Sequence, residues 1–397
     1  MTKMEDLRTL LEQNIDEELL IKLTMDLVSI ESHPLIPCQE TAVAEYIKKF
    51  FDGEGIPCYT KEVKDGRCNV VATLDSGKPG RTLMLNGHTD TVKEDGMVNA
   101  FKPWIEDGKL YGRGSSDMKG PLASAMVAMK TLKDLDLLKE GKVIFTGVCD
   151  EEQNSIGSID ILETGVTADG IIVCEPTELK VCNGNRGLEW FEFKFIGKTV
   201  HGGEQEKGIN AIAKAVDFIN VLEGGFIDRV KAKGGTVNYG VIKGGTQLST
   251  VAGECILLVD RRYTSKETYE DMCREFRDVL DDLAAKDPKF KCEMSVLDVS
   301  VMKEGYVHEP AFTELTDDIV TMTKAHTLEY EDDYDVEFIK AWTDAGLFST
   351  YGTTPVIIMG PGCMECCHSE HEYMPVDHLT KAAVIYCEVA MDYCAYK

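Results

Sequence analysis

The chain has 397 residues, 43% of them hydrophobic and 28% charged, which is typical of a globular protein and long enough for two domains. Its formal net charge of −27 argues against nucleic acids and anionic membranes as partners, because both are polyanions. Since no stretch approaches the roughly 18 apolar residues of a membrane span and no secretory signal precedes the charged first segment, we expect a cytoplasmic protein.

The first part of the chain alternates amphipathic helices with short apolar strands. The pattern predicts helices at 18–29, 41–51 and 121–138 and strands at 69–74, 82–86, 142–147 and 170–174. It returns after residue 303, with a helix near 314–324, a strand at 356–359 and a helix near 379–396. Such alternation is typical of an α/β domain with a mostly parallel sheet between helices. We therefore predict one α/β domain from residues 1–185 and 304–397.

The pattern changes between residues 186 and 303. Aromatic and charged residues alternate around 190–195, as in a half-buried strand. The next expected elements are a helix at 209–222, strands at 236–242 and 255–262, a helix at 267–285 and a strand at 290–301. The order β-α-β-β-α-β is that of a ferredoxin-like domain. We therefore predict that 186–303 form an inserted α+β domain.

Residues of the types that commonly bind metal ions follow the apolar strands of the predicted α/β domain. They are His88 and Asp90, Glu151 and Glu152, Glu175, and finally His368 and His371. Open α/β sheets place their sites beyond the carboxyl ends of the strands. Carboxylates and imidazoles from separate segments therefore predict a metal-centred active site at that edge.

The local sequence suggests roles for some of these residues. Asp90 lies two residues after His88, where its carboxylate could accept the ring N–H that a metal leaves free. Asp117 lies in the glycine-rich segment 112–120, either as a helix N-cap or as a carboxylate brought into a crowded site. Glu151 and Glu152 are adjacent and point in different directions, so one can bind metal while the other acts as general base.

The 14 cysteines are scattered and show no disulfide framework, so reduced thiols are expected. Cys363 and Cys366 have the C-x-x-C spacing of a zinc knuckle, and Cys367 follows. No second ligand pair with matching spacing is evident nearby. A structural cysteine site therefore stays an alternative to ordinary buried thiols.

Three segments, 86–92, 112–120 and 150–152, resemble motifs of the family of acetylornithine deacetylase, succinyl-diaminopimelate desuccinylase, aminoacylase and carboxypeptidase G2. The resemblance covers essentially the whole chain. It implies a zinc-peptidase-like catalytic domain with an inserted dimerisation (lid) domain. It also implies two Zn²⁺ ions per chain, for which Co²⁺ or Mn²⁺ may substitute.

The same resemblance assigns roles in the metal site. Asp117 would bridge the two ions, with His88 and Glu175 completing one ligand set. Glu152 and a late histidine would complete the other, and Glu151 would be the catalytic base and acid. His368 fits the late motif, whereas His371 stands where Asn or Asp is usual, so His371 is the alternative ligand.

The resemblance further implies a homodimer. Segment 197–203 resembles an element whose histidine, here His201, crosses the dimer interface to stabilise the oxyanion in the partner's site. Arg186 and Arg262 match positions near a substrate carboxylate, although surface salt bridges are an equal alternative. Thr343 lies in a loop that resembles one contacting the substrate. Ser249 replaces the usual Asn, which weakens inference about the acyl group.

The resulting hypothesis is metal-dependent hydrolysis of the amide bond of an N-acyl amino acid. Met118 follows the implied bridging aspartate, as in the deacetylase and desuccinylase branch, whereas the dipeptidase branch typically carries Asp there. A dipeptidase or other peptidase acting on short peptides is the alternative within the family. A binding protein without catalysis is disfavoured because the full set of ligands and the base is present.

Overall fold

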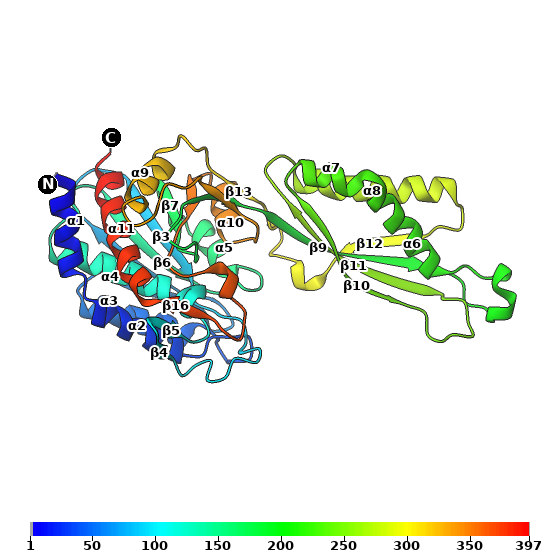
Figure 1. Cartoon of the computed structure of the whole chain (residues 1–397), viewed down its shortest axis with the longest axis horizontal. Coiled ribbons are helices and arrows are strands. Elements are labelled where there is room, and N and C mark those ends of the chain that lie inside the picture. The colour runs from blue at the N-terminus through cyan, green and yellow to red at the C-terminus, as the bar shows by residue number, and fades with distance from the viewer. Residues whose placement is uncertain (1–2, 397) are drawn as a thin grey trace. The chain divides into compact units, whose positions relative to one another are not determined.

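The computed structural model describes residues 3–396 and forms two compact units (Figure 1). Unit 1 runs to Gly184 and continues with Phe312–Ile339 and from Thr343 onward. Unit 2 consists of Asn185–Ala311 and Lys340–Trp342. The sequence placed the end of the insertion at residue 303, earlier than the structure does. Trp342 explains part of the difference, because its ring packs edge-on against His308 and its indole N–H donates to the carbonyl of Glu309.

Unit 1 is built on a nine-stranded sheet in the order β1-β2-β6-β3-β7-β15-β8-β13, with β14 paired to β8. Its central strands are parallel: β6 (Lys142–Val148), β3 (Thr82–His88), β7 (Gly170–Val173) and β15 (Val356–Ile358). The outer strands are β1 (Cys58–Lys64), β2 (Arg67–Asp75), β8 (Cys182–Asn185), β13 (Ala311–Phe312) and β14 (Glu337–Ile339). The parallel centre brings several carboxyl strand ends to one edge.

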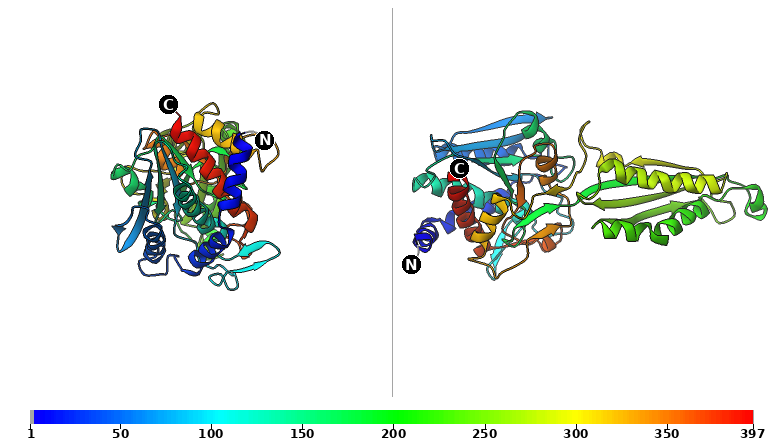
Figure 2. Two further views of the ribbon diagram at one scale, coloured as in Figure 1. Left: turned by 90° about the vertical axis from the view of Figure 1, so that its left-hand side faces the viewer. Right: turned by 90° about the horizontal axis from the view of Figure 1, so that it is seen from above.

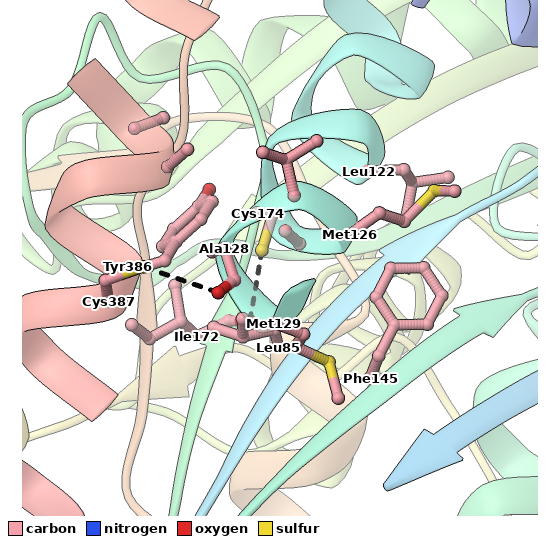
Figure 3. Packing of buried hydrophobic residues seen from close by; sticks show 14 of the residues in the cluster. Leu85, Leu122, Met126, Ala128, Met129, Phe145, Ile172, Cys174, Tyr386 and Cys387 are labelled. Atoms are coloured by element: carbon pink, nitrogen blue, oxygen red, sulfur yellow. Dashed lines mark hydrogen bonds between the residues drawn. The ribbon is translucent and has the colours of Figure 1, made fainter. Parts of the chain in front are cut away.

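Helices share a large apolar core with this sheet. Leu122, Met126 and Met129 of α4 (Gly120–Asp134) lie near Leu85 and Phe145 of the strands (Figure 3). α4 is buried nearly all round, because it also packs against the long C-terminal helix α11 (Val376–Ala395). The remaining helices of unit 1 are α1 (Lys3–Asn14), α2 (Glu17–Ser29), α3 (Thr41–Gly53), α5 (Ile156–Glu163), α9 (Asp318–Thr327) and α10 (Ala345–Thr350). α1 packs on α11, so both ends of the chain lie on one side of unit 1 (Figure 2).

A small second sheet lies beside the segment that carries Asp117. Its strands are β4 (Trp104–Glu106), β5 (Lys109–Tyr111) and β16 (Tyr373–Pro375), in the order β16-β5-β4. Tyr373 pairs with Tyr111 in this sheet. The pairing brings the segment after His368 next to the glycine-rich segment 112–120.

Unit 2 is an antiparallel sheet in the order β10-β11-β9-β12, the strand order of a ferredoxin-like domain. The strands are β9 (Gly187–Ile196), β10 (Thr236–Gly244), β11 (Glu254–Tyr263) and β12 (Cys292–Val296). Alternate residues Phe191, Phe193 and Phe195 point to one face, where α6 (Ala211–Val221) and α8 (Tyr269–Lys286) cover them. α7 (Ile227–Ala232) joins the same apolar core.

The predicted fold class is confirmed: a mostly parallel α/β sheet between helices, interrupted by a ferredoxin-like insertion. One strand is shorter than predicted, since β12 ends at Val296 and the chain turns at Asp298–Ser300. There the hydroxyl of Ser300 donates a hydrogen bond to the buried carboxylate of Glu189, and the chain no longer pairs with the sheet. Within residues 3–396, no helix is both long and apolar enough to cross a bilayer.

Candidate metal centre and active site

The predicted ligands follow the parallel strands of unit 1. His88 ends β3, Glu175 lies two residues beyond β7, and Glu152 lies four residues beyond β6. His368 follows β15 after a longer connection. Because β3, β6, β7 and β15 run parallel, the side chains beyond their carboxyl ends meet at one edge of the sheet.

Asp117 lies between the two histidines. Its Oδ1 is 3.0 Å from Nε2 of His88, and its Oδ2 is 3.0 Å from Nε2 of His368. Two groups of three ligand atoms result, each lying within 4.8 Å of one another: His88, Asp117 and Glu175, and Asp117, Glu152 and His368. The two carboxylate oxygens of Asp117 are therefore divided between two candidate metal positions.

The spacing of the ligand atoms fits divalent cations. Ligands about 2.1 Å from a tetrahedral ion lie roughly 3.4 Å from each other. Nε2 of His88 is 3.8 Å from Oε1 of Glu175, and Nε2 of His368 is 3.2 Å from Oε1 of Glu152. The other ring nitrogen of His88 is 3.0 Å from the carbonyl oxygen of Asp90, to which it donates, so Nε2 is the ring nitrogen left to bind a metal once it gives up its proton.

The negative charges of the cluster also favour the binding of cations. Burial raises the pKa of Glu175 to about 8, and the neighbouring carboxylates of Asp117 and Glu152 add to the effect of burial. Burial also favours the neutral form of Asp117, but hydrogen bonds with His368 and His88 outweigh it and hold its pKa well below the ordinary value. Carboxylates placed this close are stabilised by bound divalent ions, which supply the missing positive charge.

Asp90 contacts more than the ring of His88. The sequence predicted that its carboxylate accepts the ring N–H, but the closer acceptor is its own backbone carbonyl, with the carboxylate 3.5 Å from Nδ1. The carboxylate instead accepts the backbone N–H groups of Glu151 and Glu152, at 3.2 and 3.0 Å. Asp90 thus connects the segment that carries Glu151, the expected base, to the segment that carries His88.

Glu151 has a carboxylate that accepts no hydrogen bond within residues 3–396, in contrast to Glu152, which contacts His368. Burial raises the pKa of Glu151 well above the usual range, and the carboxylates of Glu175 and Asp344 add to this. An unengaged carboxyl group of raised pKa beside the ligand cluster has the properties of a proton acceptor.

The alternatives that the sequence left open belong to neither of these ligand groups. The His371 side chain is 81% exposed, and its ring contacts Glu370. The thiols of Cys366 and Cys367 both donate to the carbonyl oxygen of Cys363, and no group of three ligands containing cysteine occurs among residues 3–396. The glycine-rich segment does not use Asp117 as an N-cap, because α4 begins at Gly120 without a side-chain cap.

The predicted substrate residues Arg186 and Arg262 and the predicted oxyanion donor His201 lie in unit 2. Arg262 donates two hydrogen bonds to the carboxylate of Asp260, at 2.8 and 3.0 Å. Arg186 has no such partner within residues 3–396, and burial together with the charge of Arg262 lowers its pKa. His201 is exposed, and its Nδ1 accepts the N–H of Gly203 at 3.1 Å, so its Nε2 carries the proton and is the donor.

Thr343 and Met118 lie in unit 1. Thr343 is buried just before α10, where its hydroxyl oxygen accepts the N–H of Ala345. Met118 is fully buried, and its sulfur accepts the N–H of His88 at 3.2 Å. Its thioether therefore packs beneath His88, so any effect of Met118 on substrate choice is indirect.

The sequence reasoning missed two residues that contact the segment of Asp117, namely Arg113 and Glu372. Neither was given a role from the sequence. An arginine inside a glycine-rich segment and a glutamate next to the candidate histidines were the available signals. The contact between them joins residues 259 positions apart, which spacing alone does not reveal.

The comparisons with known proteins identify a family and several relatives. The model of peptidase family M20/M25/M40 matches residues 84–392. An N-formyl-4-amino-5-aminomethyl-2-methylpyrimidine deformylase of Halalkalibacterium halodurans is 29% identical, with 96% of this chain and 95% of the relative covered. A probable succinyl-diaminopimelate desuccinylase of Staphylococcus aureus is 25% identical, with 94% and 97% covered.

Solved structures share the fold. Aminopeptidase PepT from Bacillus cereus superposes with a TM-score of 0.80 at 21% identity, covering 96% of this chain and 99% of that chain. A dinuclear metal-binding peptidase of the M20 family from Bacillus subtilis gives 0.71 at 18% identity, covering 95% and 98%. At these identities the likeness concerns the fold alone.

Proposed function

The chain belongs to peptidase family M20/M25/M40, and from this premise we propose that it hydrolyses the amide bond of an N-acyl amino acid at a site built on two Zn²⁺ ions. It is a hydrolase of C–N bonds, as the family is. The observation that carries the two-ion site is the division of the Asp117 carboxylate between His88 and His368. Co²⁺ and Mn²⁺ share enough ligand preference to substitute for Zn²⁺.

The proposed ligands are the two groups around Asp117, with His88 and Glu175 on one side and Glu152 and His368 on the other. The bound ions would polarise the scissile carbonyl and lower the pKa of an attacking water. Glu151 would take the proton of that water at its free carboxylate and return it to the leaving amine. Asp90 would hold Glu151 in place through the backbone N–H.

Unit 2 would complete the site from a second copy of the chain. We propose a homodimer in which Nε2–H of His201 donates to the oxyanion in the partner's site. A donor aimed where charge develops stabilises a transition state by about 2.7–4 kcal/mol. Arg186, whose guanidinium has no carboxylate partner within residues 3–396, is the better candidate for the substrate carboxylate, because Arg262 is already bound to Asp260.

A second candidate substrate class follows from the relatives. The deformylase relatives are named for an N-formyl aminomethylpyrimidine, an amine without the α-carboxylate of an amino acid. Peptidases share the fold, so a dipeptide is the remaining alternative.

One assay separates the three classes. The kcat/KM values of N-acetyl, N-succinyl and N-formyl amino acids are compared with those of an N-formyl aminomethylpyrimidine and of unblocked dipeptides. We expect an N-acyl amino acid to exceed every dipeptide. Efficient cleavage of dipeptides with inert N-acyl amino acids would contradict the proposal, and preference for the formylated amine would support deformylation without carboxylate recognition.

A further inference from the structure

A buried ion pair lies directly behind Asp117. Arg113 Nη1 donates to Oε2 of Glu372 at 2.6 Å, and both side chains are at most 1% exposed. A buried ion pair is costly unless the remaining polar atoms also find partners. In this pair the remaining atoms do find partners, and these partners belong to the segments that carry the candidate metal ligands.

The carboxylate of Glu372 binds the backbone of the segment that carries Asp117. Its Oε1 accepts the N–H groups of Ser116 and Asp117, each at 3.0 Å. Gly114 has φ +84°, a left-handed conformation, and a Cβ there would lie 2.7 Å from Cγ2 of Thr91. The segment therefore folds tightly against residues that follow His88, and the Glu372 oxygen fixes its far end.

The guanidinium of Arg113 contacts the other segments. Its Nε donates to the carbonyl of Lys93 at 2.9 Å, and its Nη2 donates to the carbonyls of Glu94 at 3.3 Å and Ser369 at 3.1 Å. Lys93 and Glu94 follow the His88 segment, and Ser369 follows His368. One guanidinium thus joins the segments of both candidate histidines to the partner of the Asp117 backbone.

We propose that Glu372 and Arg113 are positioning residues that hold the Asp117 carboxylate between His88 and His368. This inference rests on the proposed two-ion site. Their hydrogen bonds are made to the segments that carry the candidate ligands. Because Asp117 belongs to both ligand groups, loss of this pair weakens both metal positions together, whereas loss of a ligand such as Glu175 weakens one.

Glu372→Gln is the direct test. A glutamine keeps the size of the side chain but loses the charge, and its amide cannot offer an oxygen both to the two backbone N–H groups and to Arg113. Zinc affinity of the purified full-length chain is measured by competition with a chromophoric chelator. We expect both zinc sites to weaken by about 10–100-fold, as for other residues that orient metal ligands.

Glu370→Gln is the matched control, because Glu370 lies in the same segment and its side chain is 61% exposed. It should bind zinc like the wild type, and Glu175→Gln should show one weakened site. Excess zinc should restore much of the turnover of Glu372→Gln, which a defect in a catalytic group would not permit. Hydrogen exchange should also become faster at the amides of 114–117.

A second variant, Arg113→Lys, and thermal unfolding of the metal-free proteins distinguish weakened zinc binding from a folding defect. Lysine keeps the charge but cannot bind three carbonyls and a carboxylate at once, so this variant should also weaken both sites. Wild-type zinc affinity in folded Glu372→Gln and Arg113→Lys would overturn the inference while leaving the proposed function intact. A wild-type chain that binds fewer than two ions would overturn the proposed metal site, and the inference with it.

Discussion

The carboxylate of Asp90 accepts the backbone N–H of Glu152 at 3.0 Å, and its second oxygen accepts that of Glu151. The residue before Glu151, Asp150, has φ +72°, so the chain turns sharply there and both N–H groups face one carboxylate. As a result, the side chains of the two neighbouring glutamates point in different directions. Glu152 reaches His368, while the Glu151 carboxylate accepts no hydrogen bond from the part of the chain that the structure describes.

The two glutamates should therefore respond differently to substitution. We expect Glu151→Gln to lower kcat by several orders of magnitude and to leave metal content near normal, because Glu151 is the proposed proton acceptor and not a ligand. Glu152→Gln should lower both quantities. Steady-state kinetics together with elemental analysis measure the difference. Near wild-type turnover in Glu151→Gln would show that the base is another group.

The protein should contain about two zinc ions per chain. Two groups of ligand atoms share Asp117, so we expect chelation to abolish activity and Zn²⁺ or Co²⁺ to restore it. Elemental analysis of active protein before and after dialysis against a chelator gives the stoichiometry. Full activity in protein free of transition metals would contradict the metal mechanism.

His201 should act in the site of a second copy. In a heterodimer of Glu151→Gln and His201→Ala chains, one site combines an intact Glu151 with an intact His201 from the other chain. Since each parent is inactive, purified heterodimers should recover about half of the wild-type activity. His201→Ala and Glu151→Gln homodimers are the controls. Verified heterodimers without recovery would place His201 in its own subunit or in a structural role.

The two arginines should differ in their effect on KM. Arg186→Ala should raise KM for an N-acyl amino acid at least tenfold, because it removes an unengaged bidentate donor for the substrate carboxylate. Arg262→Ala should cost less, since Arg262 is bound to Asp260. A substrate without a carboxylate is the control and should be insensitive to Arg186→Ala. Equal losses with both substrates would assign Arg186 another role.

Stability should depend on pH through His326 on α9. Burial lowers its pKa, but ion pairs with Asp392 at 2.9 Å and Glu388 at 3.2 Å outweigh burial and raise it from 6.5 to about 9. Because the folded-state pKa lies above the unfolded value, this stabilisation is complete below pH 6.5 and is lost as the pH rises through 9.

The wild type should therefore lose on the order of 2 kcal/mol of unfolding free energy relative to His326→Gln between pH 6 and 10. Urea unfolding of both proteins across this range measures the difference. Because Arg8 also binds Glu388, Arg8→Gln is a useful companion that leaves the histidine in place. Parallel stability curves for wild type and His326→Gln would show that the ion pairs do not persist in solution.

The sequence by itself determined the fold class and the candidate ligands. Alternation of apolar strands with amphipathic helices depends on short-range periodicity, and the β-α-β-β-α-β order of unit 2 can be read from the same signal. His88, Glu151, Glu152 and Glu175 were identified from their positions after the apolar strands, and Asp117 from its glycine-rich segment and the resemblance to the family. Their metal-binding and catalytic roles stay predictions that the variants above test.

Only the tertiary structure decided the contacts between distant segments. It placed His368 beside Asp117 and left His371 exposed, although the two lie three residues apart. In the folded chain the Asp90 carboxylate accepts two backbone N–H groups of another segment. Arg113 binds Glu372, which lies 259 residues further along the sequence. Local periodicity carries no information about such pairs, because the direction of each side chain is set by the packing of several segments at the same edge of the sheet.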